Sequence, residues 1–554
     1  MQKGMKLKME ITYKGKKIEV NGEKTVLEIL KDEIENSENE VLLCKCNNEI
    51  KRLDYVVDSD CKIELLDVKS REGIHAYIKL ATYIMSKAIY ETYKEALISV
   101  NYQLDYATFC KLDNMEITQE MINNIKNRMN EIIEQNIELK KVVMTQEEAK
   151  EFYEREKVLR GILQTDIKER DEVILYYCED YYNYFYGEMP LSTGYIKAFD
   201  IIKYRDGFLL RYPDVKNIYK LEPYTESKKK LAKLKEYSDI HKILKINTIY
   251  RLNKNIEKDN AKETILLAEA LHEKKIAEIA ENIARDKEKK IILIAGPSSS
   301  GKTTFAKRLG IQLMLKGLKP VTLSVDNYFV ERADNPKDEN GEYDFECIEA
   351  LDLGLFNNHV SRLLEGETVE IPTFDFSIGH KEYKGDFKTL KENEVLVIEG
   401  IHALNDKLTE AIPREKKYKI FINALTVLNT DYYNYISTRD IRLIRRIVRD
   451  SQFRGYSAET TLKMWESVTR GERKYILPFQ ESSDIMFNST LIYELAALKK
   501  YALPQLLKID NSSKFYSDAQ RLSELLQYVK PISTEYIPKN SLLREFVGGS
   551  IFEE

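Results

Sequence analysis

The C-terminal half of this 554-residue chain is predicted to form a doubly wound α/β domain with a parallel sheet, preceded by a small mixed β/α domain and a second α+β domain. Two patterns support this. Short apolar runs alternate with helical segments after residue 288, which is typical of parallel sheets. Before residue 225, apolar and polar positions alternate as in half-buried strands. The length also exceeds what one hydrophobic core usually holds, so several domains are expected.

The N-terminal half divides by pattern. Residues 5–68 hold alternating strands around one helical stretch, TVLEILKDEI, and residues 178–213 read as short strands with Gly and Pro turns. Residues 226–290 are lysine-rich and carry apolar residues at three- and four-residue spacing, which indicates amphipathic helices. The expected units are residues 1–68, 69–225, a helical connector at 226–287, a nucleotide-binding unit at 288–510, and a C-terminal extension at 511–554.

Composition excludes some classes of protein. Charged residues make up 32% and hydrophobic residues 43% of the chain, as in ordinary globular proteins. The net charge of −5 shows no global basic field of the kind that attracts nucleic acid. The basic, strand-like start lacks the apolar stretch of a signal peptide, and there is no uncharged run of 18 residues, so we expect a cytoplasmic protein with no membrane contact. Six scattered cysteines predict reduced core thiols.

Four apolar runs are the predicted strands of the C-terminal sheet. They are IILIAG (291–296), VTLSVD (321–326), VLVIEG (395–400) and KIFINA (419–424). Polar or charged residues follow each run. Because ligands bind at the carboxyl ends of strands in doubly wound sheets, these residues are the first candidates for a site.

A glycine-rich loop follows the first of these strands and opens the helix TTFAKRLGIQLML. It satisfies the phosphate-binding pattern G-x-x-x-x-G-K-[ST], in both the strand and the helix context that the pattern requires. The backbone amides and the helix N-terminus favour an anion, Lys302 reaches terminal phosphates, and Thr303 offers its hydroxyl to Mg²⁺. The predicted loop residues are Gly296, Pro297, Ser298, Ser299, Ser300, Gly301, Lys302, Thr303 and Thr304.

Two other classes of protein that contain such a loop are disfavoured. No N-K-x-D segment follows the loop to read guanine, and no L-S-G-G-Q stretch is present. A GTPase and a transporter ATPase are therefore weaker interpretations than a kinase, although the loop alone does not decide between them.

Two strand-end carboxylates suit phosphoryl transfer. Asp326 ends VTLSVD and could accept the proton of an acceptor hydroxyl, or could be a turn residue in DNYF. Glu399 ends VLVIEG and could serve on the Mg²⁺ side, or be a solvated strand end. The loop upstream favours the catalytic interpretation of both.

An arginine-rich helix is predicted in STRDIRLIRRIVRDSQFRG (437–455). Its cations could close over transferring phosphates, whereas for any single arginine a solvated basic face is an equal alternative. The six arginines are Arg439, Arg442, Arg445, Arg446, Arg449 and Arg454. The segment that follows, with Arg470, Arg473 and Lys474, could complete a lid.

Taken together, GPSSSGKTT, SVDNYF, GEYDF, IPTFDFSIGHK, VIEGIHAL and TRDIRLIRRIVRDSQFRG resemble the phosphoribulokinase/uridine kinase family in order and spacing, over residues 288–500. The resemblance implies a kinase that uses ATP and Mg²⁺, with Asp326 as the base and Thr303 and Glu399 on the metal. It also implies phosphate contacts from Lys302, and lid or phosphate contacts from Arg445, Arg446 and Arg449. The implied nucleoside site consists of Asp344 and Arg442 at the ribose and Phe374, Phe376 and His380 around the base, while His359 is more plausible as a structural residue.

The N-terminal half resembles threonyl-tRNA synthetases. Residues 1–68 are similar to the β-grasp domain that opens those enzymes, and residues 70–215 to their second, editing domain. That family holds a metal with an H-x-x-x-H and a C-x-x-x-H pair. Here His75 is followed by Lys79 and Cys178 by Tyr182, so half the ligand set is missing. We therefore expect a non-catalytic module that contacts RNA or regulates the kinase.

The resemblance implies a nucleoside 5′-kinase for uridine or cytidine that forms a homo-oligomer. Two alternatives remain open at this stage. One is a kinase of another small alcohol, as phosphoribulokinase is; the other is a regulatory module that senses a nucleotide or tRNA. The presence of Lys302, Thr303, Asp326 and Glu399 together favours the enzyme.

Overall fold

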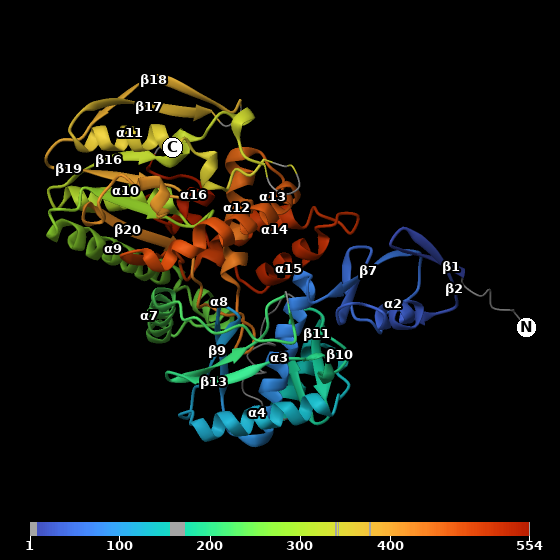
Figure 1. The fold of residues 1–554 in the computed structure, drawn as a ribbon. Helices are drawn as coiled ribbons and strands as arrows, with labels where there is room; N and C mark the ends of the chain where they lie inside the picture. Colours follow the sequence, from blue (N-terminus) through green and yellow to red (C-terminus); the bar gives the residue numbers. More distant parts are fainter. Residues whose placement is uncertain are drawn as a thin grey trace, which may run out of the picture.

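The computed structural model describes residues 8–155, 172–215, 217–337, 341, 343–375 and 378–552. Figure 1 shows a small N-terminal part to one side, an antiparallel part beneath, and a larger layered part that holds the C-terminal half. Within these described ranges, no helix is long and apolar enough to span a membrane. All six cysteines are buried and unpaired, as expected for core thiols.

The N-terminal part is built on a mixed five-stranded sheet. β1 (Lys8–Tyr13) lies between β2 (Lys16–Asn21), to which it is antiparallel, and β7 (Cys61–Asp67), to which it is parallel. β4 (Val41–Cys46) and β5 (Glu49–Lys51) complete the sheet in the order β2-β1-β7-β4-β5. The sheet encloses its own small core. This is the mixed β/α arrangement that the alternation predicts; its relation to the synthetase domain stays a prediction.

The short helical elements of this part begin at a well-formed cap. α1 (Val26–Ile29) starts at Thr25, whose side chain accepts from the Glu28 amide while Glu28 accepts from the Thr25 amide. α2 (Lys31–Glu35) follows directly, and the strand pair β3 (Lys24–Thr25) and β6 (Val56–Val57) lies beside them.

The second part consists of a long helix and two antiparallel sheets. α3 (Arg71–Thr92) is largely buried, and its Tyr83 hydroxyl donates to the backbone of a tyrosine-rich segment, residues 176–186. Tyr176, Tyr181 and Tyr184 of that segment are buried, so they build a core. The remaining elements are β8 (Ile98–Leu104), β9 (Ala107–Leu112), α4 (Gln119–Glu134), β10 (Lys140–Thr145), α5 (Gln146–Arg155), β11 (Glu172–Cys178), β12 (Tyr181–Tyr184), β13 (Asp200–Tyr204) and β14 (Gly207–Arg211).

The predicted remnants of the metal-ligand pairs lie on different elements: His75 is on α3, and Cys178 is the last residue of β11. His75 has Arg71, Arg521 and Asp440 as charged neighbours, whereas the Cys178 carbonyl accepts from Lys87, three turns further along the helix. Within the described ranges, no group of three or more His, Cys, Asp or Glu side chains could hold a metal ion. The module's expected lack of a metal site and its proposed contact with RNA stay predictions.

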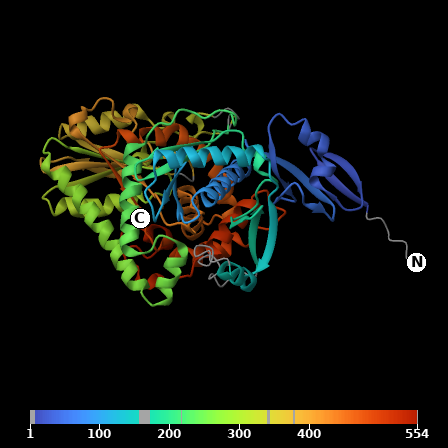
Figure 2. The ribbon, with the colours of Figure 1, turned by 90° about the horizontal axis from the view of Figure 1, so that it is seen from below.

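The second part and the C-terminal half pack as one body. Tyr153, Leu175 and Tyr184 share a hydrophobic core with the C-terminal sheet. The Tyr184 and Tyr528 hydroxyls are hydrogen-bonded, and the Val100 amide donates to Tyr432 at 2.8 Å. Figures 1 and 2 both show the two parts in contact along this side.

A charged network joins the same two parts at α3. Arg71 pairs with Asp518 and with Asp440, and Arg521 pairs with the same two carboxylates. Asp440 belongs to α12 (Thr438–Arg449) and Asp518 to α15 (Tyr516–Gln527), so the network connects three helices. Nearby arginines hold the pKa of Asp518 at about 2, which keeps this carboxylate ionised.

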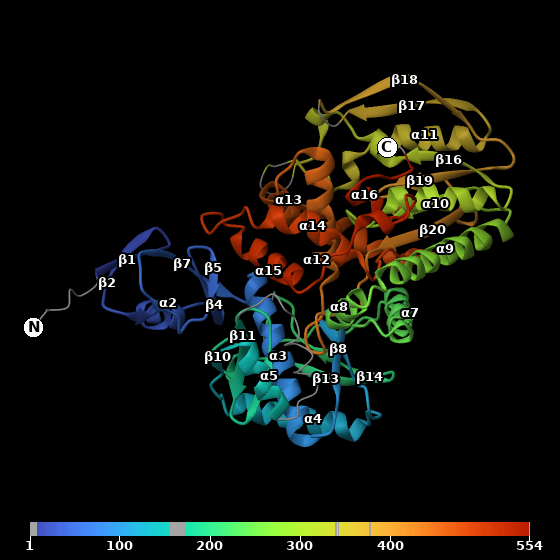
Figure 3. The same ribbon diagram turned by 180° about the vertical axis from the view of Figure 1, so that it is seen from behind.

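Residues 228–285 contain three helices. They are α7 (Lys228–Leu244), α8 (Ile249–Glu257) and α9 (Ala261–Arg285). α9 lies along the C-terminal layer, as Figure 3 shows. Arg308 of α10 (Lys302–Met314) binds Glu269 and Glu273 of α9, the latter at 2.7 Å. The predicted connector therefore includes a helix that covers the sheet.

The C-terminal half contains a five-stranded sheet in which every neighbouring pair is parallel. Its order is β16-β19-β15-β20-β21. The strands are β15 (Ile291–Ala295), β16 (Lys319–Ser324), β19 (Glu394–Glu399), β20 (Lys417–Asn423) and β21 (Ile485–Asn488).

Alternate residues of β15 face two different cores. Ile292 and Ile294 pack with α10 and α12, whereas Ile291 and Leu293 pack with α11 (Leu353–Leu364) and α7. Because side chains alternate across a strand, a strand that is apolar at every position must be covered on both faces. This confirms the doubly wound parallel sheet.

Four features of this half differ from the sequence-based expectation or were not predicted. β21 is a fifth strand, and β17 (Thr368–Asp375) and β18 (His380–Thr389) form a separate antiparallel ribbon. β16 ends at Ser324, so Asp326 lies in a short helical turn, Val325–Tyr328. The C-terminal extension folds back onto the layer through α15 and α16 (Arg544–Val547), next to α14 (Glu494–Leu506).

Candidate active site

The phosphate-binding loop runs between β15 and α10, as predicted. Ser299 and Gly301 both have positive φ, 59° and 84°, which turn the backbone toward the centre of the loop. Lys302 Nζ donates to the carbonyls of Gly296 (3.0 Å) and Pro297 (3.3 Å), so it lies over its own loop. Ser299 and Ser300 are buried, and their hydroxyls have no hydrogen-bond partner among the described residues. The loop therefore offers amides, hydroxyls and one ammonium group to an anion.

The predicted carboxylates meet beside Lys302. Ser324, the last residue of β16, is paired in register with Glu399, the last residue of β19, so Asp326 and Glu399 emerge at the same edge of the sheet. Burial raises the pKa of Asp326, while Lys302 and Arg454 oppose the rise. Burial and then the charge of Asp326 raise the pKa of Glu399 to about 7. Two neighbouring carboxylates whose proton affinities are raised are typical of a catalytic site.

Glu346 is a third carboxylate in this cluster, and no pattern in the sequence favoured it over Asp344. Burial and then the charge of Glu472 raise its pKa to about 7, while Arg446, Lys302 and Asp326 also act on it. A Cβ atom on Gly471 would lie 2.4 Å from the Glu346 Cβ, so the end of α13 (Ala458–Gly471) approaches Glu346 closely. Glu346 thus faces the same space as Asp326 and Glu399.

Asp344, the predicted ribose ligand, has other partners. Its carboxylate accepts from the Tyr475 hydroxyl (3.1 Å) and from the Glu346 amide (3.2 Å). These bonds hold the segment that carries Glu346. In this structure Asp344 therefore supports Glu346, which differs from the predicted direct role.

The residues predicted around the base are only partly placed. Phe374 on β17 packs against Phe329, three residues after Asp326, with ring centroids 5.6 Å apart. His380 begins β18, is well exposed, and bonds Glu331 at 2.7 Å. Phe376 lies outside the described residues. His359 is buried and hydrogen-bonded to Tyr328, which agrees with a structural role.

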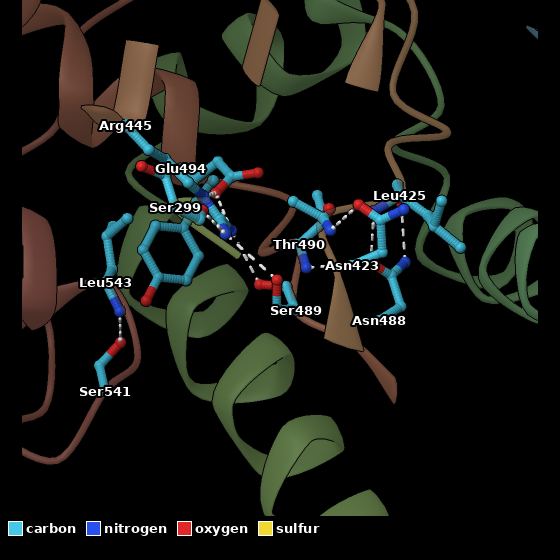
Figure 4. Close-up of polar contacts among 12 residues, drawn as sticks. Ser299, Asn423, Leu425, Arg445, Asn488, Ser489, Thr490, Glu494, Ser541 and Leu543 are labelled. Atoms are coloured by element: carbon cyan, nitrogen blue, oxygen red, sulfur yellow. Dashed lines mark hydrogen bonds and ion pairs between the residues drawn. The ribbon is translucent and has the colours of Figure 1, made fainter. Parts of the chain in front are cut away.

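The arginines of α12 fall into two groups. Arg445 is fully buried: it binds Glu494 at 2.8 Å, the Ser299 carbonyl at 3.3 Å and the Ser489 carbonyl at 2.8 Å. Figure 4 shows its guanidinium between the loop and α14. With these partners, Arg445 links the phosphate loop to the start of α14. This arrangement does not support the predicted contact of Arg445 with transferring phosphates.

Arg442 and Arg446 also hold the loop. Arg442 donates to the Ser298 carbonyl (3.1 Å) and pairs with buried Glu472, which in turn accepts from the Ser298 amide at 3.1 Å. Arg446 donates to the Ser298 hydroxyl at 2.9 Å. Arg442 was predicted to contact the ribose, but in this structure its guanidinium is bonded to Glu472 and to the Ser298 carbonyl.

Arg449 is the α12 arginine whose position best fits a transferring phosphate. It bonds Asp450 at 3.4 Å, and its buried Nε has no hydrogen-bond partner among the described residues. Burial and the neighbouring Arg454 lower its pKa. An incoming anion would relieve the repulsion between Arg449 and Arg454, so Arg449 fits the predicted role at the transferring phosphate. Arg454 also acts on Asp326 and is a second candidate for this role.

The oxygen donors fit Mg²⁺. The Thr303 side chain lowers the pKa of Glu399, whereas the charge of Asp326 raises it, so all three side chains lie close together. Mg²⁺ is usually held by one or two carboxylates together with substrate phosphates, so a preformed cluster of protein ligands is not needed. Thr303 and Glu399 therefore form an adequate protein share of such a site.

Comparisons with known proteins agree with this geometry. Residues 291–495 match the model of the Phosphoribulokinase / Uridine kinase family. A uridine kinase from Staphylococcus aureus (strain JH9) is 31% identical over 198 residues, which is 35% of this chain and 86% of the relative. A uridine kinase from Ligilactobacillus salivarius is 29% identical over 203 residues, 36% of this chain and 86% of the relative.

A solved structure described as a possible uridine kinase from Bacillus stearothermophilus has 18% identity and a TM-score of 0.24, and covers 36% of this chain and 89% of its own. At this score it adds nothing to the sheet order described above. The region matched by the family model contains the phosphate loop, Asp326, Glu346, Glu399 and α12. Through residues 291–495, this chain belongs to the phosphoribulokinase/uridine kinase family.

Proposed function

We propose that the chain is an ATP-dependent nucleoside kinase that phosphorylates the 5′-hydroxyl of uridine or cytidine in pyrimidine salvage. The observation that carries the proposal is the cluster of Asp326, Glu346 and Glu399 around Lys302 at the mouth of the phosphate loop. The relatives named uridine kinase support a nucleoside acceptor. A cytoplasmic location belongs to the same proposal.

In this mechanism the 5′-hydroxyl oxygen attacks the terminal phosphorus of ATP, and the bond from that phosphorus to the ADP oxygen breaks. Asp326 takes the hydroxyl proton. Solvent still reaches this side chain, but the protein around it partly desolvates the carboxyl group and so raises its pKa, which makes it a better proton acceptor than an ordinary aspartate. Lys302 and Arg449 neutralise the charge on the transferring group. Thr303 and Glu399 would hold Mg²⁺, which would supply further positive charge to the phosphates.

Glu346 is proposed as the acceptor for the ribose hydroxyls. It is a partly buried carboxylate whose segment is fixed by Asp344, and no ion pair within the described residues uses up its oxygens. A ribose has two neighbouring hydroxyl donors that a single carboxylate can accept together. This reassigns to Glu346 the role predicted for Asp344.

The test is a kinase assay of the full chain with ATP and Mg²⁺ against uridine, cytidine, adenosine, guanosine and ribulose 5-phosphate. We expect uridine or cytidine to be the best acceptor. Asp326→Asn, which keeps the shape and removes the base, should lower kcat by about 10²–10⁴-fold with little change in the acceptor KM. Lys302→Ala is the inactive control.

Two results would contradict the proposal. Transfer only to ribulose 5-phosphate would favour a kinase of another small alcohol. Full activity of a folded Asp326→Asn variant would show that this carboxylate is not the base.

A further inference from the structure

The C-terminal extension reaches the phosphate loop. Leu542 lies so close to Gly301 that a Cβ atom on this glycine would be 2.3 Å from the Leu542 side chain. Leu542, Leu543 and Phe546 are fully buried in the core that also contains α10 and α12. Figure 4 shows Ser541 and Leu543 beside the Arg445 cluster. The extension thus packs directly against the phosphate loop and forms one wall of it.

Several bonds keep this wall in place. The Ser541 hydroxyl is bound to Glu269 of α9, and the Arg445 guanidinium lies 5.2 Å from the centre of the Phe546 ring. Arg544 donates to the carbonyls of Thr534 (2.9 Å) and Ile537 (2.6 Å), which closes the turn before α16. These bonds hold the backbone near Glu545 in place.

The Glu545 carboxylate lies on the first turn of α10. It accepts from the Thr304 hydroxyl at 3.0 Å and from the Thr304 amide at 3.4 Å. The first amides of a helix have no partner within the helix and are the donors that a bound phosphate uses. Glu545 therefore occupies donors that a nucleotide phosphate needs.

Glu545 differs from the other carboxylate on the loop. Glu472 is buried and paired with Arg442, so its bond to the Ser298 amide is part of the fold. Glu545 is only partly buried, and over the part of the chain that the structure describes it has no ion-pair partner within 4 Å. A carboxylate held by one hydroxyl and one long amide contact is readily replaced by a phosphate.

We propose that Glu545 is a built-in competitor of the donor nucleotide. Its carboxylate and the phosphates of ATP compete for Thr304, so ATP binds only after this side chain rotates away from α10. Two anions cannot share these donors, because like charges a few ångströms apart in a partly desolvated site repel strongly. The C-terminal extension thereby lowers the affinity of the loop for polyphosphate. This inference rests on the proposed use of ATP.

The test compares the full-length protein with Glu545→Gln, Glu545→Ala and the matched control Glu535→Gln. Glu535 belongs to the same extension and is exposed, and its backbone amide donates to the Ser533 side chain that caps a short turn. Calorimetric titration with ATP and with inorganic triphosphate gives the dissociation constants. Both Glu545 variants should bind both probes about tenfold more tightly, a change of about 1.4 kcal/mol, and the control should match the parent protein.

Each other result has a distinct meaning. Unchanged affinity in the Glu545 variants, with ATP bound by the parent protein, overturns the competition alone. Weaker ATP binding with unchanged triphosphate binding would also overturn it, and would assign Glu545 to the nucleoside part of ATP. Binding of ATP by none of the four proteins would refute the proposed function as well. Melting temperatures of all four proteins show whether each variant is folded.

Discussion

The carboxylates beside Lys302 and the arginines of α12 both border the phosphate loop, but they have very different partners. Asp326, Glu346 and Glu399 stay beside Lys302, and burial raises their pKa values. Arg442, Arg445 and Arg446 are bonded to carboxylates and to loop carbonyls or hydroxyls. The carboxylates are therefore available to substrates, whereas most of the arginines hold the loop in shape.

The difference follows from how each set is attached. Parallel strands end at one edge of a sheet, so strand-end residues converge there whatever their exact rotamers. A helix presents its residues around its whole circumference, and only some of them can face a ligand. Counting arginines on a helix therefore overestimates the number that contact phosphate.

The sharpest test of this contrast is Arg445→Met beside Arg449→Met. Removing Arg445 leaves Glu494 buried and unpaired, so the free energy of unfolding should fall by about 3–5 kcal/mol. Arg449 shares Asp450 with Arg446 and Arg454, so its replacement should cost less than about 1 kcal/mol and instead lower kcat. Denaturant unfolding and steady-state kinetics measure the two effects.

A rescue experiment serves as the control for Arg445. In Arg445→Met/Glu494→Met both charges are gone, and much of the lost stability should return. If Arg445→Met is as stable as the parent protein but loses turnover, Arg445 contacts the transferring phosphate, as first predicted.

A smaller effect is expected from the acceptor carboxylates. Glu346→Gln should raise the nucleoside KM by about 10- to 100-fold, because hydrogen bonds to a charged group contribute about 1.5–3 kcal/mol, with the ATP KM nearly unchanged. Asp344→Asn should raise the nucleoside KM less than Glu346→Gln does, since Asp344 acts through the segment that carries Glu346. The reverse ranking in steady-state kinetics would restore Asp344 as the ribose ligand.

The smallest effect is on stability against pH. Glu346 and Glu399 have pKa values of about 7 in the folded protein, against ordinary values of 4.5. Between these pH values the folded protein holds more protons than the unfolded chain, so raising the pH favours unfolding. The stability of the protein without metal or nucleotide should therefore fall between about pH 5 and pH 7.5, by an amount of order 1 kcal/mol after solvent screening.

The matched control for this prediction is Glu346→Gln/Glu399→Gln. Denaturant unfolding at both pH values should give a flatter dependence in this variant than in the parent protein. Equal slopes for the two proteins would mean that these carboxylates are not perturbed.

Local patterns were enough to predict the strands β15, β19 and β20, the phosphate loop and α10, because each depends on residues adjacent in sequence. The loop needs positive φ at Gly301, and the strands need apolar residues at successive positions. The positions of Asp326 and Glu399 follow from the same patterns, since parallel topology brings strand ends together. The family resemblance over residues 291–495 depends on these segments too.

Only the tertiary structure decided how the remaining charges are shared. The choice of Glu346 over Asp344 depends on Tyr475, which is 131 residues away in sequence, and the role of Arg445 depends on Glu494, 49 residues away. Glu545 meets Thr304 across 241 residues. Such contacts are set by the packing of elements that are distant in sequence. Neither local propensity nor local spacing determines which carboxylate pairs with a given donor.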